Sequence, residues 1–228
     1  MKHRQMPRVK IGGLIDTYEV GSLTLRAAYQ YATLPGATEQ GPTFRTLSNV
    51  FGMLGAPDAA ATAANIANVM EEGFIVRFMA VSMSYDPGDW FVLSELWKQN
   101  GSTLIPKHTS GYVSGGIRIG AWTPYATIST TRMKKLDGII ALESLPQIPA
   151  LLDGVRQIND SFGLAAPGKQ TSFSIGARWD VYRNVAIKAQ YDYIALPSDS
   201  GGLFRNRSDS FQPGKDASLF GLSVDFVF

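Results

Sequence analysis

The sequence has no cysteine and only two histidines, His3 and His108. A protein without cysteine has no disulfides. Its sequence is compatible with an oxidising compartment in which stability does not come from disulfides. The two histidines belong to no metal-ligand cluster, and no glycine-rich phosphate-binding loop is present. Ser102 and Ser110 lie near His108, but no carboxylate is positioned to complete a hydrolytic site. The sequence therefore predicts a protein without a cofactor, without a metal and without enzymatic activity.

Long apolar runs and strong net charge are also absent. No stretch approaches the roughly 20 apolar residues of a transmembrane helix. The formal net charge of the 228 residues is only +2, so nucleic acid is not expected as a partner. A β-barrel is the membrane-spanning structure that escapes such a scan, because its lipid-facing and lumen-facing residues alternate. The 23 glycines, 12 phenylalanines, nine tyrosines and four tryptophans suit turn-rich strands with interfacial aromatic residues.

The most regular strand pattern lies at the C-terminal end of the sequence, from Leu219 to Phe228. One face of this strand is apolar and holds Phe220, Leu222, Val224, Phe226 and Phe228. The other face holds mostly small or polar residues. A strand of this kind is half-buried, and either a protein core or lipid could cover its apolar face.

Eight further segments alternate in the same way, which gives nine predicted strands of an all-β protein. They cover residues 9–17, 23–31, 74–85, 90–98, 112–121, 125–133, 173–181 and 185–193. Short turns at 18–21, 86–89, 122–124 and 182–184 alternate with long connections at 35–73, 99–110, 134–170 and 197–216. The long connections contain two predicted helices. Pro57-Asp58 supplies the N-cap of the first, and the second begins at Pro149, a position where proline is tolerated.

The alternation of short and long connections is typical of an outer-membrane barrel, with short periplasmic turns and long external loops. If the C-terminus is periplasmic, one assignment places all four short turns on the periplasmic side. Aromatic residues beside these turns would then form a periplasmic girdle. The predicted girdle consists of Tyr18, Tyr85, Trp90, Trp122, Tyr125, Trp179 and Tyr182.

Several short blocks resemble the C-terminal half of a Gram-negative porin. They are Tyr85-Asp86-Pro87-Gly88-Asp89-Trp90, Gly120-Ala121-Trp122-Thr123-Pro124-Tyr125, Gly176-Ala177-Arg178-Trp179-Asp180, Lys188-Ala189-Gln190-Tyr191-Asp192 and Val224-Asp225-Phe226-Val227-Phe228. The resemblance covers roughly residues 74–133 and 171–228. It implies a transmembrane antiparallel β-barrel in the outer membrane, in contact with outer-membrane lipid, and often a homotrimer. It also implies that Phe226 and Phe228 belong to the signal read by the barrel-assembly machinery.

Nine strands are an odd number, and the first would start on the external side. Bacterial single-chain barrels have even strand numbers with both termini in the periplasm. Porins of the type resembled have about sixteen strands, and no signal peptide is recognisable near Met1. We therefore expect residues 1–228 to form a single barrel domain that lacks its N-terminal strands and its signal peptide.

The function expected from the resemblance is passive diffusion of ions and small hydrophilic solutes through a water-filled lumen. The predicted pore-lining residues are Lys10, Asp16, Arg26, Glu95, Arg118, Arg178, Asp180, Lys188, Asp192 and Asp225. Two interpretations stay open for these charges. Arg26, Arg118, Arg178 and Lys188 could form a basic ladder along one wall, or the charges could pair with neighbours such as Asp180 and Asp192.

Two further alternatives concern the long connections and the class of protein. The helix expected at 59–71, with Ile66, Val69 and Met70 on one stripe, could constrict the pore, or it could form a surface lid or a subunit contact. The protein could also be a non-channel barrel with adhesive or structural loops. A soluble all-β binding domain is the remaining interpretation, and it requires the outward Phe, Ile and Tyr residues to be buried in a core of their own.

Overall fold

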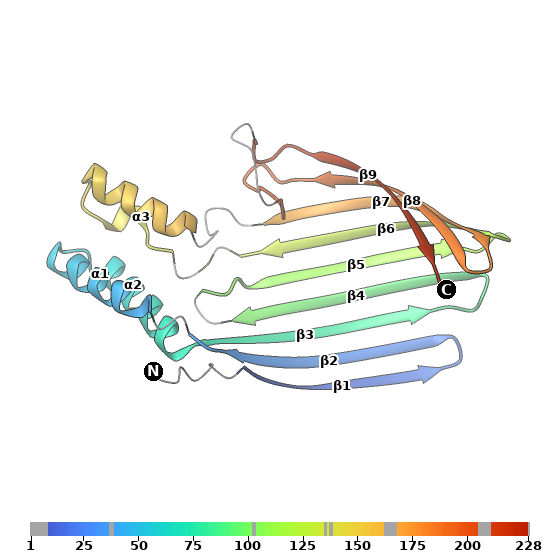
Figure 1. Ribbon diagram of the computed structural model, residues 1–228, viewed down its shortest axis with the longest axis horizontal. Helices are drawn as coiled ribbons and strands as arrows, with labels where there is room; N and C mark the ends of the chain where they lie inside the picture. Colours follow the sequence, from blue (N-terminus) through green and yellow to red (C-terminus); the bar gives the residue numbers. More distant parts are fainter. Residues whose placement is uncertain are drawn as a thin grey trace, which may run out of the picture.

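The computed structural model describes residues 9–36, 39–101, 104–134, 136, 139–161, 168–204 and 211–227. Nine antiparallel strands form one sheet in which each strand pairs with its neighbour in the sequence (Figure 1). The strands are β1 Lys10–Val20, β2 Leu23–Leu34, β3 Phe74–Tyr85, β4 Trp90–Gly101, β5 His108–Ile117, β6 Trp122–Met133, β7 Lys169–Tyr182, β8 Val185–Ala195 and β9 Ala217–Phe226. The predicted all-β antiparallel architecture is confirmed.

The connections alternate in length as the sequence predicts. The short ones, 21–22, 86–89, 118–121 and 183–184, lie at one end of the sheet, and the long ones lie at the other (Figure 1). The connection between β4 and β5 is shorter than expected, because β4 continues to Gly101 and β5 begins at His108. The two ends are called the short-turn end and the long-loop end below.

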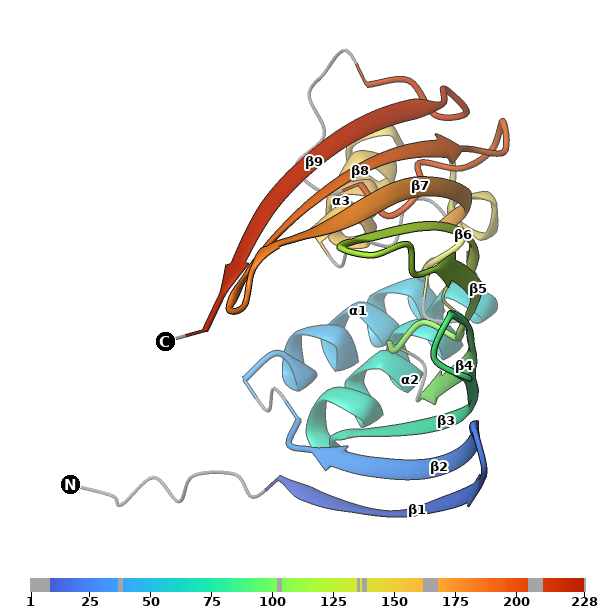
Figure 2. The same ribbon diagram turned by 90° about the vertical axis from the view of Figure 1, so that its right-hand side faces the viewer.

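The sheet is curved and open. Seen along the strands, it forms an arc whose hollow side holds the helices (Figure 2). Among the described strands β1 pairs only with β2, and β9 only with β8, so both carry an unpaired edge. The strands have 10 to 14 residues, long enough to cross the hydrocarbon layer of a membrane, which takes about 9–11 tilted residues.

The strand register divides the side chains between a concave and a convex face. Phe74 begins β3 and packs against the helices on the hollow side, so the even-numbered residues of β3 face the concave side. Cross-strand partners share a face, so the pairing of neighbouring strands extends this assignment from β1 to β9.

The register of β1 corrects one prediction. Gly21 and Ser22 form a two-residue turn with Gly21 at φ 56°, so Val20 pairs with Leu23 and Thr17 with Arg26. The sequence interpretation placed the turn at 18–21, and a one-residue slip reverses every side chain of a strand. Lys10 and Asp16 therefore lie on the convex face, opposite to Arg26. Glu19 lies on the concave face instead.

A helical layer lies beyond the long-loop end of the strands, over the concave side (Figures 1 and 2). It consists of α1 Gly41–Met53, α2 Pro57–Glu72, the 3-10 turn η1 Leu142–Ser144 and α3 Pro149–Ser161. The helices expected at Pro57 and Pro149 are confirmed, whereas α1 was not predicted. Helix α2 begins with proline at its first turn, runs through alanine-rich sequence and ends at Gly73, whose φ of 103° suits glycine.

The helical layer has a core of its own. Phe51 and Ile66 from the first long connection are buried together with Ile140 and Val155 from the second. Met70 joins this cluster, so the apolar stripe of α2 packs mainly against other helical segments and meets the sheet near Phe74. Residues of two connections distant in sequence thus fold as one unit at the mouth of the arc. None of the helices among the described residues is long and apolar enough to cross a membrane.

We expect Phe51→Ala to loosen the helical layer without disturbing the sheet. Phe51 is fully buried in the layer's core, and removing a buried phenylalanine side chain costs about 3–5 kcal/mol. Amide hydrogen exchange in α1 and α2 should accelerate while exchange in β6 and β7 stays slow. Met53→Ala is the matched control, because Met53 is 84% exposed on the same helix. Equal acceleration in both variants would contradict a cooperative core at this position.

Candidate functional site

The concave face gathers most of the charged residues that the sequence predicts to line a pore. The register places Arg26, Glu95, Arg178, Asp180, Lys188, Asp192 and Asp225 on it. Arg118 directly follows β5, and its guanidinium carbon lies 5.3 Å from the ring centroid of Phe91, another residue of this face. Eight of the ten predicted residues therefore share one face, and Lys10 and Asp16 are the exceptions.

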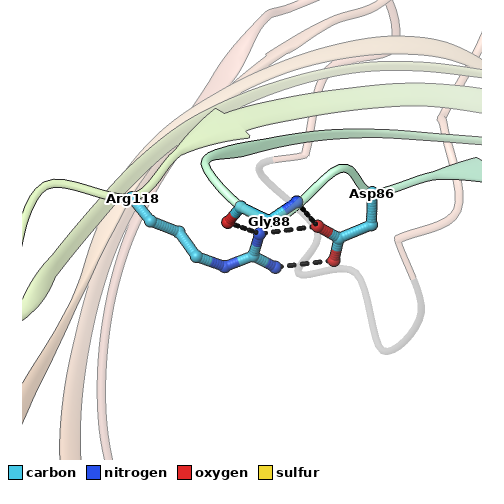
Figure 3. Close-up of polar contacts among 3 residues, drawn as sticks. All are labelled: Asp86, Gly88 and Arg118. Carbon is cyan, nitrogen blue, oxygen red and sulfur yellow. Dashed lines mark hydrogen bonds and ion pairs between the residues drawn. The ribbon is translucent and has the colours of Figure 1, made fainter. Parts of the chain in front are cut away.

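Arg118 clamps the turn between β3 and β4 (Figure 3). Its Nη1 and Nη2 donate to the two carboxylate oxygens of Asp86 at 2.7 Å each. Nη1 also donates to the carbonyl oxygen of Gly88 at 2.6 Å. The Asp86 carboxylate in turn accepts the backbone N–H of Gly88 at 3.1 Å, and Gly88 has φ 111°. A bidentate pair with this geometry fixes the turn against the end of the neighbouring strand.

The clamp shifts the proton affinity of both partners. The hydrogen bonds from Arg118 hold the pKa of Asp86 below its ordinary value, and the N–H of Gly88 contributes in the same direction. The pKa of Arg118 is raised, mainly by its hydrogen bond to Asp86. Both groups lie beyond the strand ends, at the short-turn end of the sheet.

Arg178 forms the second charged cluster of the concave face. Its Nε donates to Asp180 Oδ1 at 2.9 Å, and its Nη2 lies 2.8 Å from the same oxygen. Its Nη1 lies 3.7 Å from Asp225 Oδ2 on β9. These residues line a hollow at the short-turn end together with Tyr182, Arg183 and Val227. Ion pairs among exposed groups contribute little stability, so their main effect is to keep this end of the face charged and hydrated.

Lys188 lies directly opposite Arg178 in the register and has a different partner. Its Nζ is 5.2 Å from the ring centroid of Tyr125, a distance typical of a cation–π contact. The Tyr125 hydroxyl donates to Gln190 Oε1 at 2.8 Å, and Gln190 Nε2 donates to Asp192 Oδ1 at 2.8 Å. Lys188 and Asp192 are therefore linked through two intervening side chains, and not by a direct ion pair.

Arg26 and Glu95 complete the concave set. Both are register partners of Ser82, so two strand spacings, roughly 10 Å, separate them. Neither forms an ion pair with another described residue. Pairing with neighbours thus accounts for Arg118 and Arg178. Arg26 and Lys188 have no carboxylate partner among the described residues. This absence agrees with the basic-ladder interpretation for these two residues.

The convex face is apolar and uncovered. Ile175, Leu222 and Phe220 are 63%, 68% and 69% exposed, and no described segment packs over them. Other exposed apolar residues on this face include Leu25, Met79, Val81, Leu96, Val113, Ile128, Phe173 and Val224. The second layer that a soluble sandwich would need is missing from the part of the chain that the structure describes.

Six of the seven predicted girdle residues lie on the convex face at the short-turn end. Tyr85 and Trp90 have ring centroids 5.2 Å apart, and Trp122 stacks on Trp179 at 5.0 Å with an interplanar angle of 2°. Tyr18 and Tyr182 belong to the same face. Tyr125 is the exception, since it faces the concave side, where it contacts Lys188.

His108 and Ser110 lie close together near the long-loop end of β5. His108 Nε2 lies 2.8 Å from Ser110 Oγ, which also lies 2.7 Å from Thr131 Oγ1. No carboxylate joins them among the described hydrogen bonds, and no described group of acidic and histidine residues could hold a metal. Phe226 ends β9 on the convex face opposite Val185. Phe228 and Ser102 lie outside the described residues.

No protein-family model matches the sequence. No curated protein matches it significantly either. Among solved structures, the chain is similar to the outer-membrane-expressed OmpT of Vibrio cholerae, with a TM-score of 0.50 and 10% identity over 96% of this chain. The in-vitro folded trimer form of OmpT gives a TM-score of 0.51 with 12% identity over 96% of this chain. A porin refined at 1.8 Å resolution gives 0.46 with 12% identity over 94% of this chain and 50% of its own.

The chain spans 56% of the length of each of the two OmpT structures. At 10–12% identity these similarities define the fold alone. The class that they establish is the antiparallel sheet of an outer-membrane β-barrel, present here as nine consecutive strands.

We expect the Asp86 carboxyl to titrate below about pH 3.9, the ordinary value of an aspartate. Because its folded pKa is lowered, the clamp stabilises the turn above the unfolded pKa, and this stability is lost as the pH falls through the folded pKa. Arg118→Gln should raise the pKa of Asp86 toward its ordinary value, as measured by NMR titration. Arg183→Gln, in the turn between β7 and β8, is the control and should leave the titration unchanged.

Proposed function

We propose that the chain forms part of the wall of a porin, a water-filled channel in the outer membrane of a Gram-negative bacterium, for ions and small hydrophilic solutes. The observation that carries the proposal is the division of side chains between the two faces of the sheet. Most of the predicted pore-lining charges lie on the concave face, and most of the exposed apolar residues of β2 to β9 lie on the convex face. Such a channel breaks no bond, so no catalytic residue is needed.

Lipid is the medium that suits the convex face. Soluble monomers seldom expose a contiguous apolar patch larger than a few hundred Å², whereas every one of the nine strands has exposed apolar side chains on this face. The aromatic residues at its short-turn end match the girdle of a membrane interface. Residues at this end also include Phe226, which suits a role in the assembly signal.

Water is the medium that suits the concave face. Arg26, Glu95, Lys188 and the Arg178–Asp180 pair would be unfavourable in an apolar interior, but they are well solvated beside an aqueous lumen. The unpaired edges of β1 and β9 need partners, because lipid offers no hydrogen bonds to the backbone. We therefore propose that further strands complete the barrel in the membrane.

A trimer would explain the one carboxylate on the convex face of the strands. Asp16 lies there beside Ala27, and a carboxylate facing hydrocarbon is costly. A subunit contact over β1 would cover it. One of the similar structures is a trimer form of OmpT, which is consistent with a homotrimeric assembly here.

A non-channel barrel with structural or adhesive loops is the second candidate. The helical layer over the long-loop end of the concave side favours it, because a packed layer at this position could close the mouth (Figure 2). Conductance measurements separate the two candidates.

We expect Ile175→Arg to prevent stable insertion into the membrane. An arginine on the lipid-facing side at mid-depth costs about 2–4 kcal/mol, whereas at a water-exposed position the same change would be nearly neutral. Ser174→Arg is the matched control, because its side chain faces the concave side of the same strand. The measurement is the amount of protein recovered from the outer-membrane fraction. Equal recovery of the two variants would contradict the assignment of the faces.

We expect the protein extracted from outer membranes to form ion channels in planar lipid bilayers. Arg26→Gln combined with Lys188→Gln removes two concave-face cations without a carboxylate partner. The permeability ratio should shift toward cations by about two-fold or more. Lys134→Gln combined with Lys215→Gln removes two cations from connections outside the strands and should leave the reversal potential close to that of the unmodified protein. Absence of conductance would favour the non-channel candidate.

A further inference from the structure

A row of cations crosses the convex face at the long-loop end of the sheet. Lys98 on β4 and Arg132 on β6 are both register partners of Thr109 on β5. Arg132 also pairs directly with Lys169 on β7. Arg77 on β3 pairs with Asn100, which lies two residues beyond Lys98 on β4, toward the long-loop end. We call Arg77, Lys98, Arg132 and Lys169 the basic row.

Three of the four cations in the basic row lack an acidic partner among the described residues. Arg77, Lys98 and Arg132 are exposed, and they form no ion pair with another described residue. Lys169 alone has a partner, with its Nζ 2.8 Å from Asp199 Oδ2. No carboxylate lies on the convex face of β3 to β7. Like charges placed directly opposite one another destabilise a sheet, so this arrangement calls for anions from outside the chain.

The distance from the basic row to the aromatic residues of the short-turn end matches the thickness of a membrane. Eight residues separate Lys98 from Trp90 on β4, and ten separate Arg132 from Trp122 on β6. At about 3.4 Å per residue these spans are roughly 27 and 34 Å along the strand. A strand tilt of 35–45° reduces them to roughly 19–28 Å, a range that includes the apolar band of about 25 Å in outer-membrane barrels.

The basic row therefore lies where hydrocarbon gives way to lipid headgroups. Arginine and lysine keep their stems on apolar surface while the charged ends reach the interface. On the side of the basic row that faces the short-turn end, the convex face carries Val81 and Leu96, and then Val113, Ile128 and Phe173. The long-loop end is external in the proposed orientation, so the row faces the outer leaflet.

From the register, the missing counter-charges and the membrane-matched spacing, we propose that the basic row binds phosphate-bearing headgroups of outer-leaflet lipids. This inference rests on the proposed insertion in the membrane. Lys98 and Arg132 are two strand spacings apart, roughly 10 Å, so both side chains can reach one phosphate group. Lys10 lies on the same face near the same end, on β1, which extends the positive charge toward that edge.

Native mass spectrometry of the protein extracted from outer membranes tests the proposal. The probes are phosphatidic acid, which carries a phosphate monoester, and phosphatidylcholine, which has no net charge. We expect the protein to retain phosphatidic acid preferentially. Combined Arg77→Gln, Lys98→Gln and Arg132→Gln should weaken this binding on the order of 100-fold. The control combines Arg26→Gln, Arg183→Gln and Lys188→Gln, which removes the same charge from other places and should change binding little.

The other outcomes overturn the proposal in distinguishable ways. Equal retention of the two lipids, or equal weakening in both triple variants, would reject the basic row as a specific site. Displacement of phosphatidic acid by excess inorganic phosphate would indicate a site for free phosphate. Recovery of the unmodified protein without detergent would reject the proposed membrane function itself. Circular dichroism of each variant, with unchanged strand content, excludes misfolding as the cause.

Discussion

The backbone hydrogen bond between neighbouring strands is the constraint on which the rest of this structure depends. A chain in hydrocarbon must satisfy every N–H and C=O group within protein. Each of the seven inner strands does so by pairing on both sides. Once the strands are paired, successive side chains must point to opposite faces, and one face can be apolar while the other stays charged. The two media that the proposed function requires, lipid and water, are thus separated by a single layer of backbone.

The same constraint explains why much of the fold was predictable and why one strand was not. In β3 and in β5 to β9 alternation is clear, and a face assigned to one residue fixes the face of the others. The first strand has apolar residues on both faces, such as Ile15 and Leu14, so alternation alone does not orient it. Only the turn decides, and the two-residue turn at Gly21 and Ser22 reverses the assignment of Lys10 and Asp16. Tyr125 was misassigned for a related reason, because proximity to a turn does not specify a face.

Contacts between segments that are distant in the sequence could not be predicted from local sequence patterns. Helix α1 has no acidic residue in its first turn and no basic residue in its last, and its N-cap residue Gln40 makes no side-chain capping hydrogen bond. Its position depends on Phe51 packing with residues as distant as Ile140 and Val155. The clamp likewise joins Asp86 and Arg118, which are 32 residues apart. Arg118 was predicted to line the pore and Asp86 was not. The two residues pair because β4 and β5 together bring the chain back to the same end of the sheet.

The two ends of the sheet differ in how some of their cations are paired. At the short-turn end, cations on the concave face pair with carboxylates of turns and neighbouring strands, as in Arg118–Asp86 and Arg178–Asp180. These pairs tie turns to strands and need nothing from outside the chain. At the long-loop end, the convex face carries Arg77, Lys98 and Arg132 with no acidic neighbour in the described sheet. Cations that repel one another are tolerable where a dense layer of external anions is always present, and a membrane surface with phosphate groups provides such a layer. In the proposed arrangement, Arg118 and Arg178 are balanced by carboxylates of the same chain, whereas Arg77, Lys98 and Arg132 would be balanced by lipid headgroups.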